Sequence, residues 1–83
     1  MEKDQAKVGQ KVIITDSILG DLIGEKGTII KIFGQDDRAE IKFDNQNKVK
    51  LYMHRGITSR GTRTYYFSKI RPMHCIHRKQ TNV

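Results

Sequence analysis

Arginine, glycine and hydroxyl side chains are concentrated in one stretch of the chain, residues 54–64. Arg55, Arg60 and Arg63 lie there beside two glycines and four serine or threonine residues. Guanidinium groups bind phosphate through two parallel hydrogen bonds, and hydroxyl groups and glycine amides supply further donors. Because Ile57 is the only strongly apolar residue of the stretch, we expect an exposed loop whose chemistry suits phosphate groups. A plain solvated loop is the alternative.

Lysine and tyrosine residues on either side of this loop extend the pattern. Lys48, Lys50 and Tyr52 occupy the outward positions of a strand expected over residues 48–53. An exposed tyrosine among lysines can stack on a base of a single-stranded nucleic acid, although such a ring often only covers its neighbours. The candidate nucleic-acid-binding residues are Lys48, Lys50, Tyr52, Arg55, Arg60, Arg63, Tyr66, Lys69 and Arg71, and Arg78 and Lys79 extend their charge.

The charge of the chain is distributed unevenly. The formal net charge is +7, and all nine acidic residues lie in residues 1–44 beside seven Lys or Arg residues. Residues 45–83 contain nine Lys or Arg residues and no acidic residue. Such asymmetry indicates a surface that meets a polyanion or an acidic protein. A basic face that serves only solubility is the alternative.

The residue types needed for catalysis or metal binding do not form a recognisable pattern. Asp36 and Asp37 have the composition of a turn, and no serine or cysteine nucleophile is matched to a base. His74, Cys75 and His77 crowd one short segment without a distant second ligand pair, which argues against a structural zinc site. The sequence therefore predicts a protein that is not an enzyme and has no cofactor, metal or small-molecule substrate.

Alternation of apolar and polar residues predicts strands at residues 11–15, 27–33, 38–43 and 48–53, and a short strand at residues 65–67. The segments 38–43 and 48–53 are expected to form a hairpin joined by residues 44–47, with Val49, Leu51 and Met53 facing inward. Residues 68–72 are similar to the closing turn and final strand of small barrels.

A turn with two glycines, Gly24 and Gly27, precedes the second strand. With Thr28, Ile29 and the strand upstream, residues 8–32 resemble the KOW motif of SH3-like barrels, which occurs in ribosomal proteins and transcription elongation factors. The resemblance implies an all-β, five-stranded SH3-like barrel over residues 8–72, with a flexible leader at 1–7 and a basic tail at 73–83. An unrelated small barrel with glycines at its tightest corner is the alternative.

Residues 16–25 contain a second candidate site, made by the apolar residues Ile18, Leu19, Leu22 and Ile23. We expect them to fold back over the mouth of the barrel, or else to form an exposed tip for a protein partner. The leading hypothesis is a non-catalytic barrel that binds DNA or RNA. The alternative is a protein-interaction module, of the kind a phage or plasmid encodes, that binds an acidic host protein of the transcription machinery or the ribosome.

Composition also bears on location. The mean hydropathy is -0.63, and no apolar stretch reaches the length of a membrane span or a signal sequence. Cys75 is the only cysteine, so no disulfide can form within the chain. We expect a cytoplasmic protein without a membrane partner.

Overall fold

The computed structural model describes residues 1–17, 19–53 and 55–73, and its main element is one five-stranded antiparallel sheet with the strand order β4-β3-β2-β1-β5. The strands are β1 (Lys11–Ile14), β2 (Lys26–Phe33), β3 (Arg38–Phe43), β4 (Thr62–Tyr66) and β5 (Ile70–Pro72). The helical elements are η1 (Lys3–Gln5), η2 (Gly34–Asp36), α1 (Gln46–Val49), η3 (Lys50–Tyr52) and η4 (Phe67–Lys69). None of these helices exceeds four residues, so the all-β prediction is confirmed.

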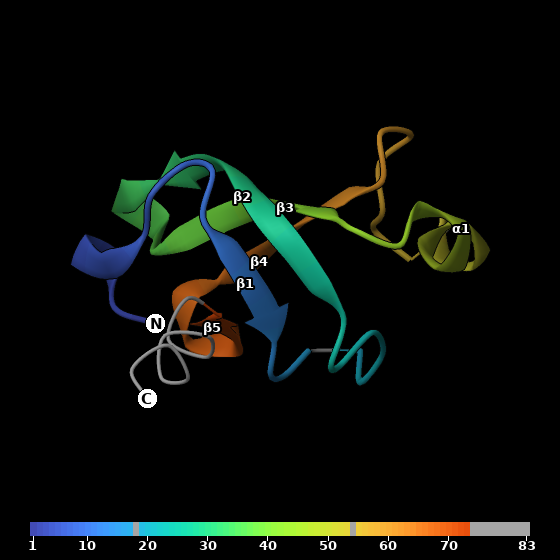
Figure 1. The fold of residues 1–83 in the computed structure, drawn as a ribbon, viewed down its shortest axis with the longest axis horizontal. Coiled ribbons are helices and arrows are strands. Elements are labelled where there is room, and N and C mark those ends of the chain that lie inside the picture. The colour runs from blue at the N-terminus through green and yellow to red at the C-terminus, as the bar shows by residue number, and fades with distance from the viewer. Residues whose placement is uncertain (18, 54, 74–83) are drawn as a thin grey trace, which may run out of the picture.

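The inner face of the sheet holds the hydrophobic core. On β3, Ala39, Ile41 and Phe43 are buried, as their alternation with polar residues predicts. The register of β2 against β3 shifts between Ile29 and Lys31, which marks a β-bulge, and a bulge bends its strand. Figure 1 shows the resulting twisted sheet, with α1 at one end of the molecule and η1 at the other.

Gly27 lies where β2 passes close to β3. A Cβ atom at this position would lie 2.5 Å from Cγ2 of Ile41 and 2.7 Å from the carbonyl oxygen of Lys42. The second of these atoms belongs to the backbone, so it cannot move aside as a flexible side chain does. Gly27 is therefore required for the packing of the two strands, whereas Gly24 has a φ of 92° and open space around it.

We expect Gly27→Ala to lower the free energy of unfolding by about 1–3 kcal/mol, because the added methyl group must push β3 away. Urea unfolding measures this change. Gly24→Asn is the matched control, since asparagine tolerates a positive φ and meets no neighbour there, and it should cost less than about 1 kcal/mol. A Gly27→Ala protein as stable as the wild type would contradict the close approach of the strands.

The strand predicted at residues 48–53 is wrong, and so is the hairpin between it and residues 38–43. These residues form the end of α1 and all of η3. The side chain of Asn45 accepts a hydrogen bond from the Lys48 backbone N–H at 3.0 Å and caps α1, which favours the helical turn over an extended strand. Val49 is buried as predicted, but Leu51 and Met53 are exposed.

The prediction of an exposed loop at residues 54–64 is also wrong in part. The partner of β3 is β4, which begins at Thr62, so the final residues of the predicted loop belong to the sheet. Ile57 and Thr62 are buried, and the Thr62 backbone is held by Thr58, whose N–H donates to the Thr62 carbonyl at 2.9 Å. The predicted final strand is confirmed, because η4 turns the chain into β5 and Ile70 enters the core.

Residues 1–7, expected to form a flexible leader, make specific contacts with the sheet. The Met1 ammonium group donates hydrogen bonds of 3.1 Å to the carbonyl groups of Phe67 and Ile70. The Met1 and Ala6 side chains pack against the core. At the other end, the Met73 N–H donates to the Lys11 carbonyl and extends the pairing of β5 with β1. The rest of the predicted tail, residues 74–83, lies outside the described residues.

Candidate nucleic-acid interface

Most of the basic residues singled out in the sequence are paired with acidic residues. The pairs are Lys48–Glu25, Arg55–Asp21, Arg60–Glu40, Arg63–Asp21 and Lys69–Asp16. Lys50 and Arg71 are the two of the candidate cations that form no ion pair within the described part of the chain. Arg78 and Lys79 lie outside that part. The structure therefore does not gather the candidate cations into one free basic surface.

Arg63 is buried and forms the centre of a polar network. Its Nη1 donates to Oδ1 of Asp21 at 2.9 Å and to the Tyr65 hydroxyl group at 3.0 Å, and its Nη2 donates to Oδ2 of Asp21 at 3.3 Å. The second amino group also donates to the Arg55 carbonyl. Asp21 further binds Nε of Arg55 at 3.1 Å and the Ser17 hydroxyl group at 3.2 Å. The network ties the loop after β1 and the segment before β4 to the edge of the sheet.

The Asp21 carboxylate should make the stability of the protein depend on pH. The hydrogen bond from Arg63 lowers the pKa of Asp21 below its ordinary value. A group whose pKa is lower in the folded state stabilises the fold above its unfolded pKa, and this contribution is lost as pH falls below about 4. We expect Asp21→Asn to flatten this acid-side loss of stability, measured by urea unfolding at several pH values. An unchanged pH profile would contradict the assignment.

The tyrosines divide between the core and the surface. Tyr52 was expected to face outward, but it is half-buried and packs against the core. Tyr65 is buried and meets the Phe43 ring edge to face, with the centroids 6.2 Å apart. Tyr66 is 45% exposed, and the guanidinium carbon of Arg38 lies 5.7 Å from its ring centroid. Tyr66 is therefore the tyrosine whose ring is most available for stacking.

The apolar residues of the loop after β1 are also partly buried and partly exposed. Leu22 is buried in the core, as expected of a residue that folds back over the sheet. Leu19 and Ile23 are 51% and 53% exposed. Ile18 lies outside the described residues. A protein partner at this loop would therefore meet Leu19 and Ile23 rather than Leu22.

A different set of basic residues shares the outer face of the sheet, the face opposite the core. Directly paired residues of antiparallel strands point to the same face, so the register places side chains in rows. One row runs through Thr62, Lys42, Thr28 and Lys11, and another contains Thr64, Glu40 and Lys31. The six basic residues of the outer face are Lys11, Lys26, Lys31, Arg38, Lys42 and Arg71.

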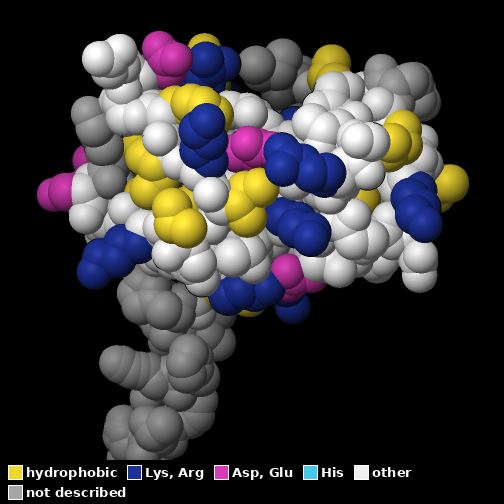
Figure 2. Space-filling model, turned by 90° about the horizontal axis from the view of Figure 1, so that it is seen from above, with side chains coloured by type: hydrophobic (Ala, Val, Ile, Leu, Met, Phe, Trp, Pro, Cys, Tyr) yellow, Lys and Arg dark blue, Asp and Glu magenta, His cyan; other side chains and the backbone are white. Residues whose placement is uncertain are grey.

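Four of these six cations have no ion-pair partner among the described residues: Lys26, Lys31, Lys42 and Arg71. Lys11 pairs with Asp44, and Arg38 pairs with Asp36, both at exposed positions. Exposed pairs contribute little and exchange readily with other anions. Figure 2 shows one face of the molecule, on which Lys and Arg side chains lie among hydrophobic side chains and some of them lie beside acidic side chains.

Glu40 is the one acidic residue within the paired rows of this face, and its charge is already neutralised. Its Oε2 accepts a hydrogen bond of 2.7 Å from the Thr62 hydroxyl group and lies 3.4 Å from Nη2 of Arg60. Its side chain is only 14% exposed. Basic side chains therefore outnumber acidic ones in the paired rows of the outer face.

Five of the six basic residues of the outer face were not among the candidates predicted from the sequence: Lys11, Lys26, Lys31, Arg38 and Lys42. All five lie in residues 1–44, the part of the chain with an excess of acidic residues, so counting charge by halves hid them. A usable signal was present, since the alternation in residues 38–43 already placed Lys42 outward. Aligning the outward residues of neighbouring strands would have identified the row that contains Lys42 and Lys11.

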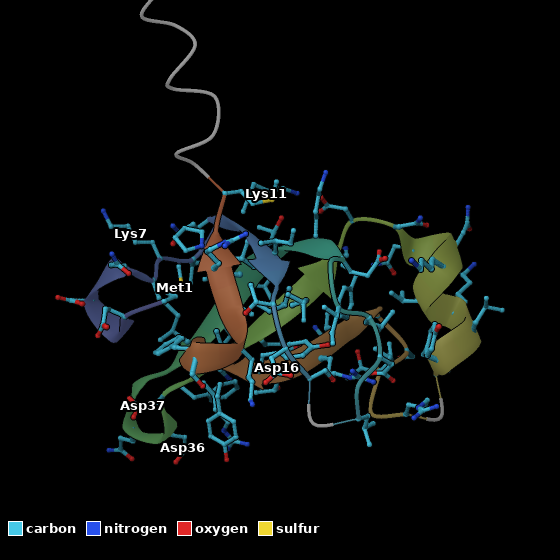
Figure 3. All side chains as sticks on the ribbon, turned by 90° about the horizontal axis from the view of Figure 1, so that it is seen from below. Met1, Lys7, Lys11, Asp16, Asp36 and Asp37 are labelled. Atoms are coloured by element: carbon cyan, nitrogen blue, oxygen red, sulfur yellow. The ribbon has the colours of Figure 1, made fainter. Side chains whose placement is uncertain are left out.

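The described residues contain no group of three or more His, Cys, Asp or Glu residues able to hold a metal ion. Asp36 ends η2, and Asp37 follows it with a left-handed φ of 55°, as expected of turn residues. Figure 3 shows both at the connection between β2 and β3, away from Asp16. His74, Cys75 and His77 lie outside the described residues.

No helix of the described chain is long and apolar enough to cross a membrane. Comparison with protein-family models gives no match, and neither does a search of curated proteins.

Proposed function

We propose that this protein binds nucleic acid, without catalysis, through the outer face of its sheet. The observation that carries the proposal is the set of four cations without ion pairs among the described residues, Lys26, Lys31, Lys42 and Arg71. The paired rows of this face contain one acidic residue, Glu40, which is already paired with Arg60. Lysine and arginine side chains on such a surface replace the counterions of a phosphate backbone. The proposal keeps the predicted ligand and moves the binding site from the loop at residues 54–64 to the sheet.

A polyanion fits this face better than an isolated acidic group. The free cations are spread over β2, β3 and β5 rather than gathered into one pocket. The hydroxyl groups of Thr28, which pairs with Lys42, and of Thr64, in the row of Lys31, are additional hydrogen-bond donors. A chain of regularly spaced phosphates can contact several such positions at once.

The finer description of the fold is also a proposal: an SH3-like barrel with a KOW-like turn. The strand order supports it, because β5 pairs with β1 while η4 connects β5 to β4 at the opposite edge. The bulge in β2 supports it too, since a bent strand lets a small sheet curl on itself. Small barrels host many unrelated activities, so the fold alone does not argue for nucleic acid.

Salt dependence tests the proposed function. If the outer face neutralises about five phosphates, the logarithm of the binding constant should fall with the logarithm of the salt concentration at a slope of about -3.5 for single strands and about -4.5 for duplexes. Fluorescence anisotropy with labelled oligonucleotides at several salt concentrations gives this slope. Binding that does not change with salt would contradict the proposal.

The exposed side chains of Leu19 and Ile23 favour a second candidate function, a protein-interaction module that binds an acidic protein. Replacement of both residues by aspartate leaves the buried Leu22 in place, so the core is kept. If the double variant loses function in the source cell while a variant of Lys31 and Lys42 does not, the protein-partner hypothesis is favoured over nucleic-acid binding.

A further inference from the structure

Two aromatic rings and one guanidinium group form a row across three strands of the outer face. The register pairs Phe33 of β2 with Arg38 of β3, and Arg38 with Tyr66 of β4. All three side chains therefore point away from the core. Since neighbouring strands lie about 4.8 Å apart, the backbones that carry the two rings are separated by about 10 Å.

Each ring of this row is already in contact with a cation. The Lys31 ammonium group lies 5.1 Å from the centroid of Phe33, and the Arg38 guanidinium carbon lies 5.7 Å from the centroid of Tyr66. Arg38 is tethered by one exposed ion pair, with Asp36 at 3.0 Å. The row thus combines flat apolar surfaces with positive charge, which is the combination that binds bases and phosphates of a single strand.

The surface beside Tyr66 has room for a base. A cavity of about 440 Å³ opens along β4, the edge strand of the sheet, and Tyr66, Arg38 and Thr64 are among its lining residues. Its volume lies within the range of pockets that hold small organic ligands, about 300–1,000 Å³. Ser17, Leu19 and Lys69 also line it, so the cavity lies at the edge of the sheet, beside the loop after β1 and η4.

We infer that the ligand of the outer face is a single-stranded nucleic acid, whose bases stack on Phe33 and Tyr66 while Lys31 and Arg38 bind the phosphates between them. The inference rests on the proposed function and adds the class of nucleic acid and the residues that select it. Bases inside a duplex are stacked on each other and do not present their flat faces, so a duplex gains only the charge contacts.

Abasic oligonucleotides separate stacking from charge. The experiment compares single strands of about twelve nucleotides, a typical site length, as oligothymidine, oligouridine and an abasic strand with the same phosphates, together with a duplex of equal length. We expect the wild-type protein to bind the base-bearing strands at least about tenfold more tightly than the abasic strand. The variant Phe33→Leu/Tyr66→Leu should lose this preference and bind base-bearing and abasic strands equally. Leu51→Ala, at an exposed position off the row, is the control.

The outcomes distinguish the inference from the proposed function. Equal binding of base-bearing and abasic strands, with both weakened by substitution of Lys31 and Lys42, would overturn stacking and leave the charged face in place. Tighter binding of the duplex than of the single strands would overturn the inference in the same way. Absence of binding to all four ligands at low salt would overturn both. A difference between oligothymidine and oligouridine would assign the strand to DNA or to RNA.

Discussion

Replacing Arg63 by alanine should remove about 3–5 kcal/mol from the free energy of unfolding, the usual cost of breaking a buried ion pair. The change leaves the Asp21 carboxylate, whose side chain is 9% exposed, without its main partner. It also removes the donor to the Tyr65 hydroxyl group and to the Arg55 carbonyl. A domain of this size has a total stability of roughly 4–12 kcal/mol, so the variant should be largely unfolded under mild denaturing conditions.

Arg60→Ala is the matched control for this experiment. Arg60 lies on the same segment and also pairs with a carboxylate, Glu40, but its side chain is 70% exposed. Exposed pairs contribute about 0–1 kcal/mol, and Glu40 keeps its hydrogen bond from Thr62. Urea unfolding of both variants measures the difference. Equal stability of the two variants would show that the buried network does not hold the two loops to the sheet.

These two arginines show what a sequence does not reveal about this site. Arg55, Arg60 and Arg63 lie close together in the chain and were given one role, phosphate binding. Arg63 differs from Arg60 because it forms a buried ion pair with Asp21. Asp21 lies 42 positions away from Arg63 in the sequence. Nothing local predicts that pairing, because it depends on the loop after β1 folding against β4.

The fold was predictable where local pattern and tertiary contacts agree. The alternation in residues 38–43 and the apolar run after Gly27 gave the correct positions of β3 and β2, because each strand buries the face that its pattern indicates. Apolar and polar residues alternate equally well in residues 48–53, yet these residues form helical turns. The Asn45 side chain caps α1, and of the three apolar residues expected to face inward only Val49 is buried. A short alternating run fits both structures, so the pairing partner of β3 could not be found locally.

The basic outer face was predictable only in part for a related reason. The outward direction of Lys42 follows from alternation, but its neighbours Thr28 and Thr62 come from other strands. The cross-strand register, and the shift at the bulge that brings Lys31 opposite Glu40, set which charges share a face. Neither is encoded by the composition of the two halves of the chain.

Replacing Lys31 and Lys42 should produce the second large effect, a loss of affinity for nucleic acid. Lys31 and Lys42 are exposed, lie on adjacent strands of the outer face and have no ion pair within the described chain. If each contributes one charged hydrogen bond to a phosphate, at about 1.5 kcal/mol, replacing both by glutamine should weaken binding about 100-fold. The magnitude of the salt slope should fall by about 2, one for each lost contact.

The measurement that tests the central claim most directly compares this variant with Lys48→Gln/Lys50→Gln. Both variants lose two positive charges, but Lys48 is already paired with Glu25, and Lys50 belongs to η3 and not to the sheet. In fluorescence anisotropy with one labelled single strand at low salt, Lys31→Gln/Lys42→Gln should bind about 100-fold more weakly than the wild type, and the control should change by less than about threefold. Equal losses in the two variants would show that net charge alone determines binding. A larger loss in the control would move the site away from the outer face of the sheet.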